Sequence, residues 1–404
     1  MRILQLCKKF PYPLKDGESI AVTYLAKALH DIGCKVTLLA MNTTKHPVIV
    51  GKLAPEIHHY QHIHYVNVDN EVKPLLAFLD LFSNDSYNIS RFESPAFASK
   101  LKQLLSRNEY DLIQLESLYL TPYIPLIRKH SSASIVLRAH NVEHEIWERM
   151  GVNADMTIRR WYFEYISRKL KKYELDQLKF IDCLLSISSR DFELFKSLGY
   201  KGEGHAVPIG LDLRDFPFRK VSPKDRLSVS FIGSLDWMPN VEGLNWFLDR
   251  IWPHLSMIFP GLSLHIAGRN CPDWIRNLSI KNIIVHGEVE DSRSFLLEHP
   301  VSVVPLLSGS GMRVKILEAM ALGRVVVSTN IGFEGLPISD KKEILVANDE
   351  EEFIRKFRFI YHHRNHLPEL SLRARKLVEN EFDHLKIARH LMSVYRVLQP
   401  DSQL

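Results

Sequence analysis

The sequence predicts an α/β protein composed of two doubly wound parallel-sheet domains. Its 404 residues are enough for two or three domains. Short apolar runs typical of strands alternate with amphipathic helical stretches, which is typical of βα units. The alternation restarts after Lys201–His205, a polar, glycine-rich segment near the middle of the chain. We therefore expect one domain over 1–204, a second over 205–382, and a final helix over 383–404 that can pack back on the first domain.

The first half begins with a strand and a helix. The run Arg2–Leu6 predicts the first strand, and the turn-rich loop after it ends at Gly17. From Ala21 to Ile32 the apolar residues recur at helical spacing, and Gly33 is suited to end that helix. The other strands expected in this half are Val36–Ala40, Leu112–Leu115, Ile135–Leu137 and, as the last one, Leu184–Ile187.

The second half has the same pattern without a sequence repeat. Its expected strands are Ser228–Ile232, Leu262–Ala267, Ile283–His286, Val301–Val304 and Val325–Ser328. Its expected helices are Val241–Trp252, Arg313–Leu322, Glu351–Tyr361, Leu370–Glu381 and Leu385–Leu398. Ligands of doubly wound sheets usually bind at the carboxyl ends of the strands, so two such sheets side by side would share one cleft.

The overall charge and the cysteines exclude several classes of protein. A net charge of +5 is too small to indicate a nucleic-acid partner, and it suits anionic small molecules or an anionic membrane surface equally well. The four cysteines form no CxxC pair, which favours reduced thiols in a cytoplasmic setting. The first six residues are too short for a signal peptide, and no run approaches the roughly 20 apolar residues that span a bilayer. We expect a cytoplasmic protein, at most peripheral on the membrane.

The segment Val304–Thr329 carries the strongest chemical signal. A buried strand leads into the loop Ser308–Gly311, whose backbone N–H groups can bind an anion where the next helix begins. Arg313 and Lys315 follow in the first turn of that helix, where two cations are unfavourable unless an anion is present. Glu318 lies three residues further on. The alternative is an ordinary amphipathic helix with solvated charges and a Lys315–Glu318 pair.

The run GMRVKILEAMALGRVVVST, followed by Gly332–Gly335, resembles the donor-binding region of family 4 glycosyltransferases. The resemblance covers most of the chain and is strongest from Phe231 to Leu336. It also includes FIGSLDWMPN (Phe231–Asn240), IAGRN (Ile266–Asn270), VHGEVED (Val285–Asp291), AVPIGLD (Ala206–Asp212) and RAHNVEHEIW (Arg138–Trp147). It implies the GT-B fold, in which two Rossmann-like domains face a central cleft, and a retaining transfer from a nucleotide-sugar donor.

The resemblance also implies which residues bind the donor. They are Gly17, Gly233, Ser234, Arg269, Gly287, Glu288, Val289, Ser310, Gly311, Met312, Arg313, Lys315 and Glu318. Glu318 is expected on the ribose hydroxyls and Gly287–Val289 on the base, whereas Arg269 can contact phosphate or brace a loop.

Two positions depart from the family pattern. Ser310 stands where many members carry Glu, and Ser234 stands where many carry Arg. We expect Arg313 and Lys315 to supply the compensating positive charge at the diphosphate and to act in catalysis. The main-chain amides of Ser310 and Gly311 would then face the sugar or the phosphate.

His140 is the candidate catalytic residue of the first half. It follows the strand Ile135–Leu137, and the resemblance places it on the transferred sugar. The alternative is a structural histidine bonded to a carboxylate such as Glu143. His144 and four other histidines lack the spacing of metal ligands, and the sequence contains no Asp-x-Asp. We therefore expect no metal and no cofactor. The four are His58, His59, His62 and His64.

The stretch Arg159–Lys179 is both basic and aromatic, which suits a helix at the anionic inner membrane surface or one whose aromatic residues pack inward.

We predict a metal-independent hexosyltransferase that moves a sugar to a carbohydrate or lipid-linked hydroxyl. Synthesis of polysaccharide, lipopolysaccharide or another glycoconjugate is the expected context. The alternatives are a sugar-nucleotide epimerase of the same fold and a non-catalytic nucleotide-sugar-binding protein.

Overall fold

The computed structural model describes the chain except for residues 15, 50–56, 72–86, 153–155, 310–312 and 400–404. The chain divides into two compact units. Unit 1 comprises Met1–Gly210 and His384–Leu404, and unit 2 comprises Leu211–Asp383. The predicted boundary between 204 and 205 lies inside strand β7 (Gly204–Ala206), which is paired with β6 (Cys183–Ser186) in unit 1.

Unit 1 is built on a seven-stranded parallel sheet in the order β3-β2-β1-β4-β5-β6-β7. The remaining strands are β1 (Arg2–Cys7), β2 (Lys35–Thr43), β3 (His62–Val68), β4 (Leu112–Leu115) and β5 (Ser134–Ala139). The strand order reverses between β1 and β4, where a doubly wound sheet offers its binding crevice. β1 and β4 are buried on both faces, as apolar runs in a parallel sheet require.

Two strands of unit 1 were absent from the sequence prediction. β3 is an edge strand of alternating polar and apolar residues that is mostly half-buried or exposed, so it lacks the apolar run of a central strand. β7 has only three residues, and the expectation that Leu184–Ile187 is the last strand of this half is therefore wrong.

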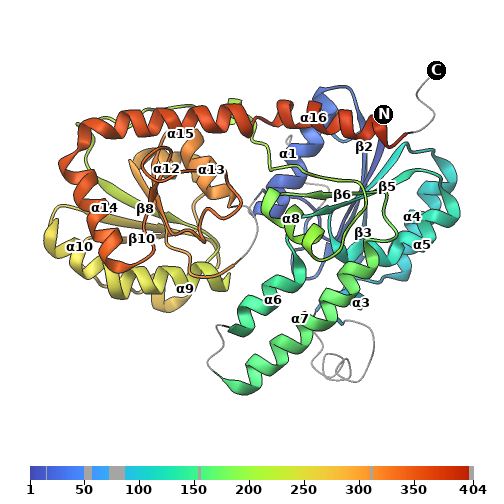
Figure 1. Ribbon diagram of the computed structural model, residues 1–404, viewed down its shortest axis with the longest axis horizontal. Coiled ribbons are helices and arrows are strands. Elements are labelled where there is room, and N and C mark those ends of the chain that lie inside the picture. Colours follow the sequence, from blue (N-terminus) through green and yellow to red (C-terminus); the bar gives the residue numbers. More distant parts are fainter. Residues whose placement is uncertain (15, 50–56, 72–86, 153–155, 310–312, 400–404) are drawn as a thin grey trace. The chain divides into compact units, whose positions relative to one another are not determined.

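Helices cover both faces of this sheet (Figure 1). The side chain of Asp16 caps the first helix, α1, by accepting from the amide of Ser19. Leu391 and Tyr395 of the last helix, α16, are buried in the same core cluster as Leu29 of α1. The helices of unit 1 are α1 (Gly17–Asp31), α3 (Tyr87–Ser90), α4 (Pro95–Arg107), α5 (Ile124–His130), α6 (Glu143–Val152), α7 (Thr157–Gln177), α8 (Ser189–Ser197) and α16 (His384–Val397).

Unit 2 is built on a six-stranded parallel sheet in the order β10-β9-β8-β11-β12-β13. Its strands are β8 (Ser228–Ile232), β9 (Ser263–Ala267), β10 (Ile283–Gly287), β11 (Val301–Val304), β12 (Val325–Ser328) and β13 (Leu345–Val346). The order reverses between β8 and β11. The predicted α/β class with two doubly wound parallel sheets is confirmed, and only the two-residue β13 of this half was missed.

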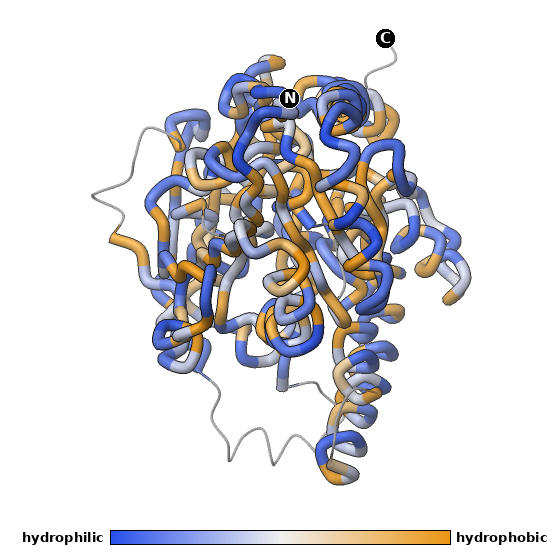
Figure 2. The backbone as a smooth tube through the Cα atoms, turned by 90° about the vertical axis from the view of Figure 1, so that its left-hand side faces the viewer, coloured by the Kyte–Doolittle hydropathy of each residue, from blue (hydrophilic) through white to orange (hydrophobic). Residues whose placement is uncertain are grey.

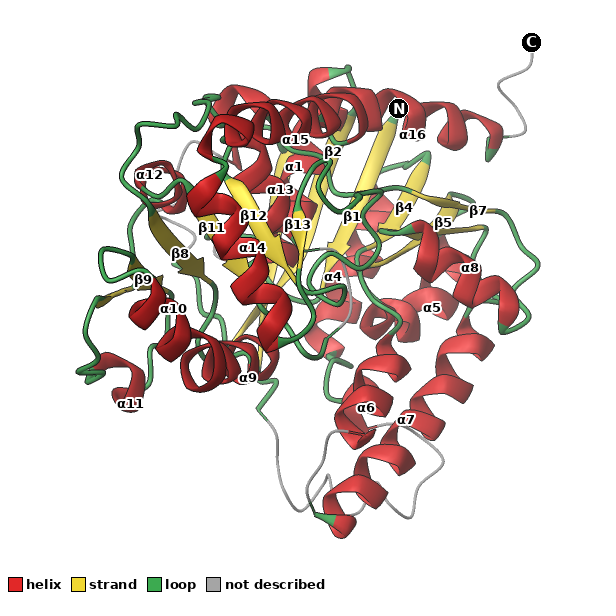
Figure 3. Cartoon of the chain, turned by 60° about the vertical axis from the view of Figure 1, so that its left-hand side comes forward, coloured by secondary structure: helices red, strands yellow, loops and turns green. Residues whose placement is uncertain are grey.

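The helices of unit 2 lie on both faces of its sheet (Figure 3). They are α9 (Met238–Trp246), α10 (Trp252–Ile258), α11 (Asp273–Arg276), α12 (Ser292–Glu298), α13 (Val314–Ala321), α14 (Glu350–His362) and α15 (Leu367–Glu381). The single helix predicted over Val241–Trp252 is instead α9, a π-helical turn over Phe247–Ile251, and α10. Pro253 explains the change of register, because proline has no N–H to continue the helical hydrogen bonds.

Hydrophobic residues concentrate along the inner strands, and hydrophilic residues dominate the outer turns of the chain (Figure 2). Within the described part of the chain, no helix combines the length and the apolarity needed to cross a membrane.

The chain passes from one unit to the other twice. The amide of Leu211 donates to the carbonyl of Phe382 at 2.8 Å, and Gly210 lies directly against His384. The two connecting segments therefore run side by side where they leave each unit.

Candidate active site

The carboxyl ends of β8, β9 and β11 in unit 2 bring several of the predicted donor-binding residues together. Gly233 and Ser234 follow β8, and Arg269 follows β9. A Cβ on Gly268 would lie 1.9 Å from the carbonyl oxygen of Gly233, so only glycine permits the two loops to approach this closely.

Asn240 connects these loops to helix α13. The ammonium Nζ of Lys315 donates to Asn240 Oδ1 at 2.8 Å, and Asn240 Nδ2 donates to the carbonyl of Ser234 at 2.9 Å. Arg269 Nε donates to Ser234 Oγ at 2.7 Å, so Arg269 does brace the Ser234 loop. Ser234 in turn donates to Asp236 Oδ1. Lys315, Ser234 and Arg269 thus belong to one hydrogen-bond network.

Lys315 sits in an environment that disfavours its charge. Burial, together with the positive charge of Arg313, lowers the pKa of Lys315 to about 7. Its ammonium also lies 5.3 Å from the ring centroid of Phe231. Among the described residues, Lys315 donates to Asn240 and forms no ion pair with Glu318. The predicted alternative of a solvated Lys315–Glu318 pair is therefore wrong.

Arg313 is the N-cap residue of α13 and does not lie in the first turn of the helix, where it had been predicted. Gly309 has a φ of +107°, and a Cβ there would lie 2.5 Å from a guanidinium nitrogen of Arg313. The loop after β11 therefore follows a backbone path that favours glycine, and the guanidinium packs directly on it. Ser310, Gly311 and Met312, which were predicted to contact the donor, lie outside the described residues.

Glu318 is half-buried on α13. Burial raises its pKa to about 7, an effect that Arg293 opposes and Asp291 increases. Arg293 is itself engaged with Asp291, since its Nε donates to Asp291 Oδ1 at 2.9 Å. A carboxylate held in such a site gains from hydroxyl donors, because charge-assisted hydrogen bonds offset the loss of water.

We expect Glu318→Ala to weaken nucleoside binding about ten- to a hundred-fold, corresponding to roughly 1.5–3 kcal/mol for lost hydrogen bonds to a charged group. We expect the ionised form of Glu318 to accept the ribose hydroxyls, and its pKa is about 7 in the free protein. Wild-type affinity should therefore rise as the pH increases through 7, and the variant should lose this dependence. Calorimetric titration with a nucleoside lacking phosphate tests this, since phosphate would also engage Lys315. Unchanged affinity in a folded variant would make Glu318 structural.

For the other predicted donor residues, the structure gives their positions in the fold. Gly287 ends β10 with a φ of +68°, and Glu288 and Val289 follow it at the carboxyl edge of the sheet. Gly17 is the first residue of α1 in unit 1, next to the capping residue Asp16.

His140 lies at the corresponding edge of unit 1 and is bonded to a carboxylate that the sequence analysis did not select. Its Nε2 lies 2.9 Å from Glu116 Oε2, and both side chains are buried. Arg138 Nη1 lies 3.3 Å from the same oxygen, and Gln5 donates to Glu116 Oε1. Burial alone would raise the pKa of Glu116, but Arg138 and His140 hold it at about 2. The carboxylate is thus ionised and fixes the ring of His140.

Glu143, the partner considered for His140, has other neighbours. It accepts from the hydroxyl of Tyr119 at 2.9 Å, and its amide donates to Glu174. Burial raises the pKa of Glu143, and Lys8 partly offsets the rise. His144 is a structural residue, since its Nδ1 lies 2.6 Å from Glu174 in a fully buried pair. Glu116 directly follows the predicted strand Leu112–Leu115, and that position is the signal that could have identified it.

The described residues contain one group of three side chains within metal-ligand reach, formed by His265, His286 and His299. The histidines considered from the sequence were His144 and the four between residues 58 and 64, and these form no such group within the described chain.

Residues 226–363 match the family model of glycosyl transferases group 1. Unit 2 is therefore a group 1 glycosyltransferase domain. Among curated proteins, the chain of this glycosyltransferase is 23% identical over 403 residues to an uncharacterized 44.6 kDa protein in the cps region of Klebsiella pneumoniae, covering 96% of this chain and 97% of that one. It is 23% identical over 339 residues to a phosphatidyl-myo-inositol mannosyltransferase of Mycolicibacterium smegmatis, covering 82% and 76% of the two chains.

The glycosyltransferase has the GT-B fold. A crystal structure of Anabaena HepE in complex with UDP matches it with a TM-score of 0.69 and 14% identity, over 98% of this chain and 100% of that one. The predicted glycosyltransferase identity and the predicted fold are both confirmed by these matches, whereas membership of family 4 stays a prediction.

Proposed function

We propose that this glycosyltransferase transfers a hexosyl group from a nucleotide-sugar donor to a carbohydrate or lipid-linked hydroxyl, with retention at the anomeric carbon. The observation that carries the proposal is the network of Lys315, Asn240, Ser234 and Arg269 at the carboxyl edge of the unit 2 sheet. It places cationic donors beside a glycine-dependent loop, an arrangement suited to a diphosphate. The HepE complex with UDP supports a uridine nucleotide as the first donor to test.

The chemistry follows from the charge that develops on the leaving diphosphate. Lys315 and Arg313 meet this charge, and Glu318 holds the ribose. The acceptor hydroxyl attacks on the face that the diphosphate leaves, and a diphosphate oxygen accepts its proton. The Klebsiella relative, which is named for a cps region, supports a role in polysaccharide or related glycoconjugate synthesis.

Release of the nucleoside diphosphate tests this function. We expect release from the preferred nucleotide-sugar only when an acceptor is added. An epimerase would convert the donor sugar without acceptor, and a binding protein would retain the donor unchanged. Either result would contradict the proposal.

We further propose that transfer requires no divalent metal, and we expect it to continue in excess EDTA. The sequence has no Asp-x-Asp to hold a cation on the diphosphate, whereas Arg313 and Lys315 supply positive charge there. The assay compares turnover with EDTA, with added Mg²⁺ and with added Mn²⁺. Loss of activity in EDTA and recovery with Mg²⁺ or Mn²⁺ would mean that a metal performs this role.

Helix α7 supports a peripheral contact with anionic lipid, which we also propose. Its residue Leu170 is buried, whereas Ile158 and Trp161 near its start are 76% and 54% exposed. Arg159 and Arg160 lie beside them, an arrangement suited to an interfacial helix. Trp161→Glu should reduce co-sedimentation with phosphatidylglycerol vesicles and leave the low binding to phosphatidylcholine unchanged. Trp274→Glu on α11 of unit 2 is the matched control, and an equal loss in that variant would contradict the assignment.

A further inference from the structure

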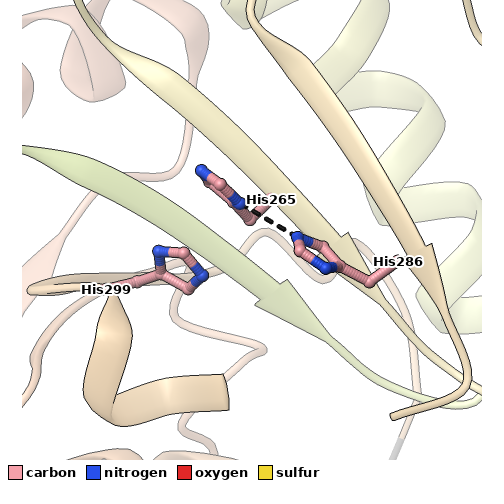
Figure 4. A group of neighbouring side chains, drawn as sticks. All are labelled: His265, His286 and His299. Atoms are coloured by element: carbon pink, nitrogen blue, oxygen red, sulfur yellow. Dashed lines mark hydrogen bonds between the residues drawn. The ribbon is translucent and has the colours of Figure 1, made fainter.

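Three imidazole rings lie beside one another in the unit 2 sheet. His265 belongs to β9, His286 to the neighbouring strand β10, and His299 to the turn between α12 and β11. One ring nitrogen of each residue lies within 4.8 Å of the other two (Figure 4). His265 Nδ1 and His286 Nε2 are 3.0 Å apart. The three residues are separated by 21 and 13 positions along the sequence, so only the fold brings them together.

Two serines fix the orientation of the rings. Ser263 Oγ lies 3.1 Å from His265 Nε2, and Ser228 Oγ lies 2.9 Å from His299 Nδ1. Each hydroxyl oxygen can accept the N–H of its ring, which leaves the lone pair on the opposite nitrogen. His299 Nε2 is then available as a ligand, and so is His265 Nδ1 once a metal ion replaces its contact with His286 Nε2. Hydrogen-bonded outer partners of this kind position histidine ligands in metal sites.

One ring nitrogen of the three histidines lacks a hydrogen-bond partner. The side chain of His299 is only 4% exposed, and its Nε2 is buried without a hydrogen-bond partner within the described chain. A buried polar atom that lacks a partner lowers stability, so such atoms call for an explanation. A metal ion between the three rings would occupy this lone pair.

We propose that His265, His286 and His299 bind a divalent transition-metal ion of the Zn²⁺ class. Three imidazole nitrogens suit Zn²⁺, with a water in the fourth position. Tetrahedral Zn–N bonds of about 2.0–2.1 Å place ligand nitrogens roughly 3.4 Å apart, which lies within the observed separations. Binding requires a small rotation that separates the tilted rings of His265 and His299, whose centroids are 4.1 Å apart. The exposed His286 gives the ion a path from solvent.

The site is independent of sugar transfer, because no step of the proposed chemistry uses it. It joins the edge strand β10 and its neighbour β9 to the turn that enters β11. His286 also directly precedes Gly287, where the loop assigned to the base begins. Bound metal would therefore stabilise this side of unit 2.

Zinc titration of the full-length, untagged chain tests the proposal. After treatment with chelator and its removal, the protein competes with a chromophoric chelator for Zn²⁺. We expect one equivalent to bind and the melting temperature to rise. His286→Gln and His299→Gln should each weaken Zn²⁺ binding at least about tenfold and abolish the rise, since each removes a ligand. His64→Gln, on the edge strand β3 of unit 1, is the matched control and should bind like wild type.

Two results would overturn the site. One is wild-type binding no tighter than that of the variant lacking all three histidines, and the other is an equal loss in His64→Gln. His286 is exposed on an edge strand, so His286→Gln keeps the test valid even when His299→Gln fails to fold. The absorption spectrum of the Co²⁺-loaded protein provides a separate readout, with tetrahedral nitrogen ligation expected and an octahedral spectrum contradicting it.

Discussion

Lys315→Ala is expected to lower the turnover of sugar transfer on the order of 100- to 1000-fold, and Arg313→Ala should have a similar effect. Fixed donors that meet charge developing on a leaving group act mainly in the transition state, which explains the size of the loss. Lys315→Arg should restore activity only partly. A planar guanidinium does not reproduce a compact ammonium that donates to Asn240 beside the ring of Phe231.

The pH dependence separates Lys315 from a general loss of structure. The pKa of Lys315 is about 7 in the free protein, and a bound diphosphate should raise this pKa. Lys315 should therefore take up a proton when the diphosphate binds near neutral pH. Calorimetry of nucleoside diphosphate binding in buffers of different ionisation enthalpy measures this uptake. Its absence in wild type, or its persistence in Lys315→Ala, would contradict the role.

Stability provides a second readout for the same residue. The folded-state pKa of Lys315 lies below that of the unfolded chain, so its burial costs stability in the protonated state. This cost is fully present below pH 7 and decreases as the pH rises toward the unfolded pKa of about 10.4. Lys315→Met, which keeps the length without the charge, should therefore melt higher than wild type at pH 6 while losing turnover. The exposed Lys281→Ala should change neither property.

His140→Ala is expected to lower turnover on the order of 100-fold while the affinity for the bare nucleoside diphosphate stays nearly unchanged. His140 belongs to unit 1, whereas the Lys315 hydrogen-bond network, which we propose binds the diphosphate, lies in unit 2. The ionised Glu116 orients the ring, and we expect the imidazole held in this way to contact the transferred sugar. Steady-state kinetics and calorimetric titration of the same variant provide the two measurements.

His205→Ala is the matched control, since His205 also pairs with a carboxylate, Glu203, at 2.7 Å. It should retain wild-type turnover. A fall in nucleotide affinity as large as the fall in turnover would contradict the assignment of His140 to the sugar. Equal loss of turnover in both variants would indicate a structural effect of removing a histidine–carboxylate pair.

The strands that the sequence predicted best are those buried on both faces. Leu112–Leu115, Ser228–Ile232, Val301–Val304 and Val325–Ser328 were predicted with the bounds that the structure has. Their apolar runs are local information. The strands β3, β7 and β13 are edge strands or very short ones, and their stability comes from neighbours that a local pattern cannot reveal.

The same distinction applies to the site. Arg313, Lys315 and Glu318 share one loop and helix, so their pattern is visible in the sequence. Asn240 binds Lys315 across 75 residues, and Glu116 receives a hydrogen bond from Gln5 across 111 residues. Both contacts form only when distant segments of the chain come together in the fold, and neither residue was selected from the sequence.

The paired connecting segments at Gly210–Leu211 and Asp383–His384 affect how the protein is made on the ribosome. Unit 2 is continuous in sequence and can complete its core as soon as it has been translated. Unit 1 is split, and its core includes Leu391 and Tyr395 from the end of the chain. The first 210 residues must therefore wait, with the face that receives α16 uncovered, until nearly all of the chain has emerged. Exposed apolar surface of this kind is where nascent chains aggregate, and it makes unit 1 the part that chaperones would protect during synthesis.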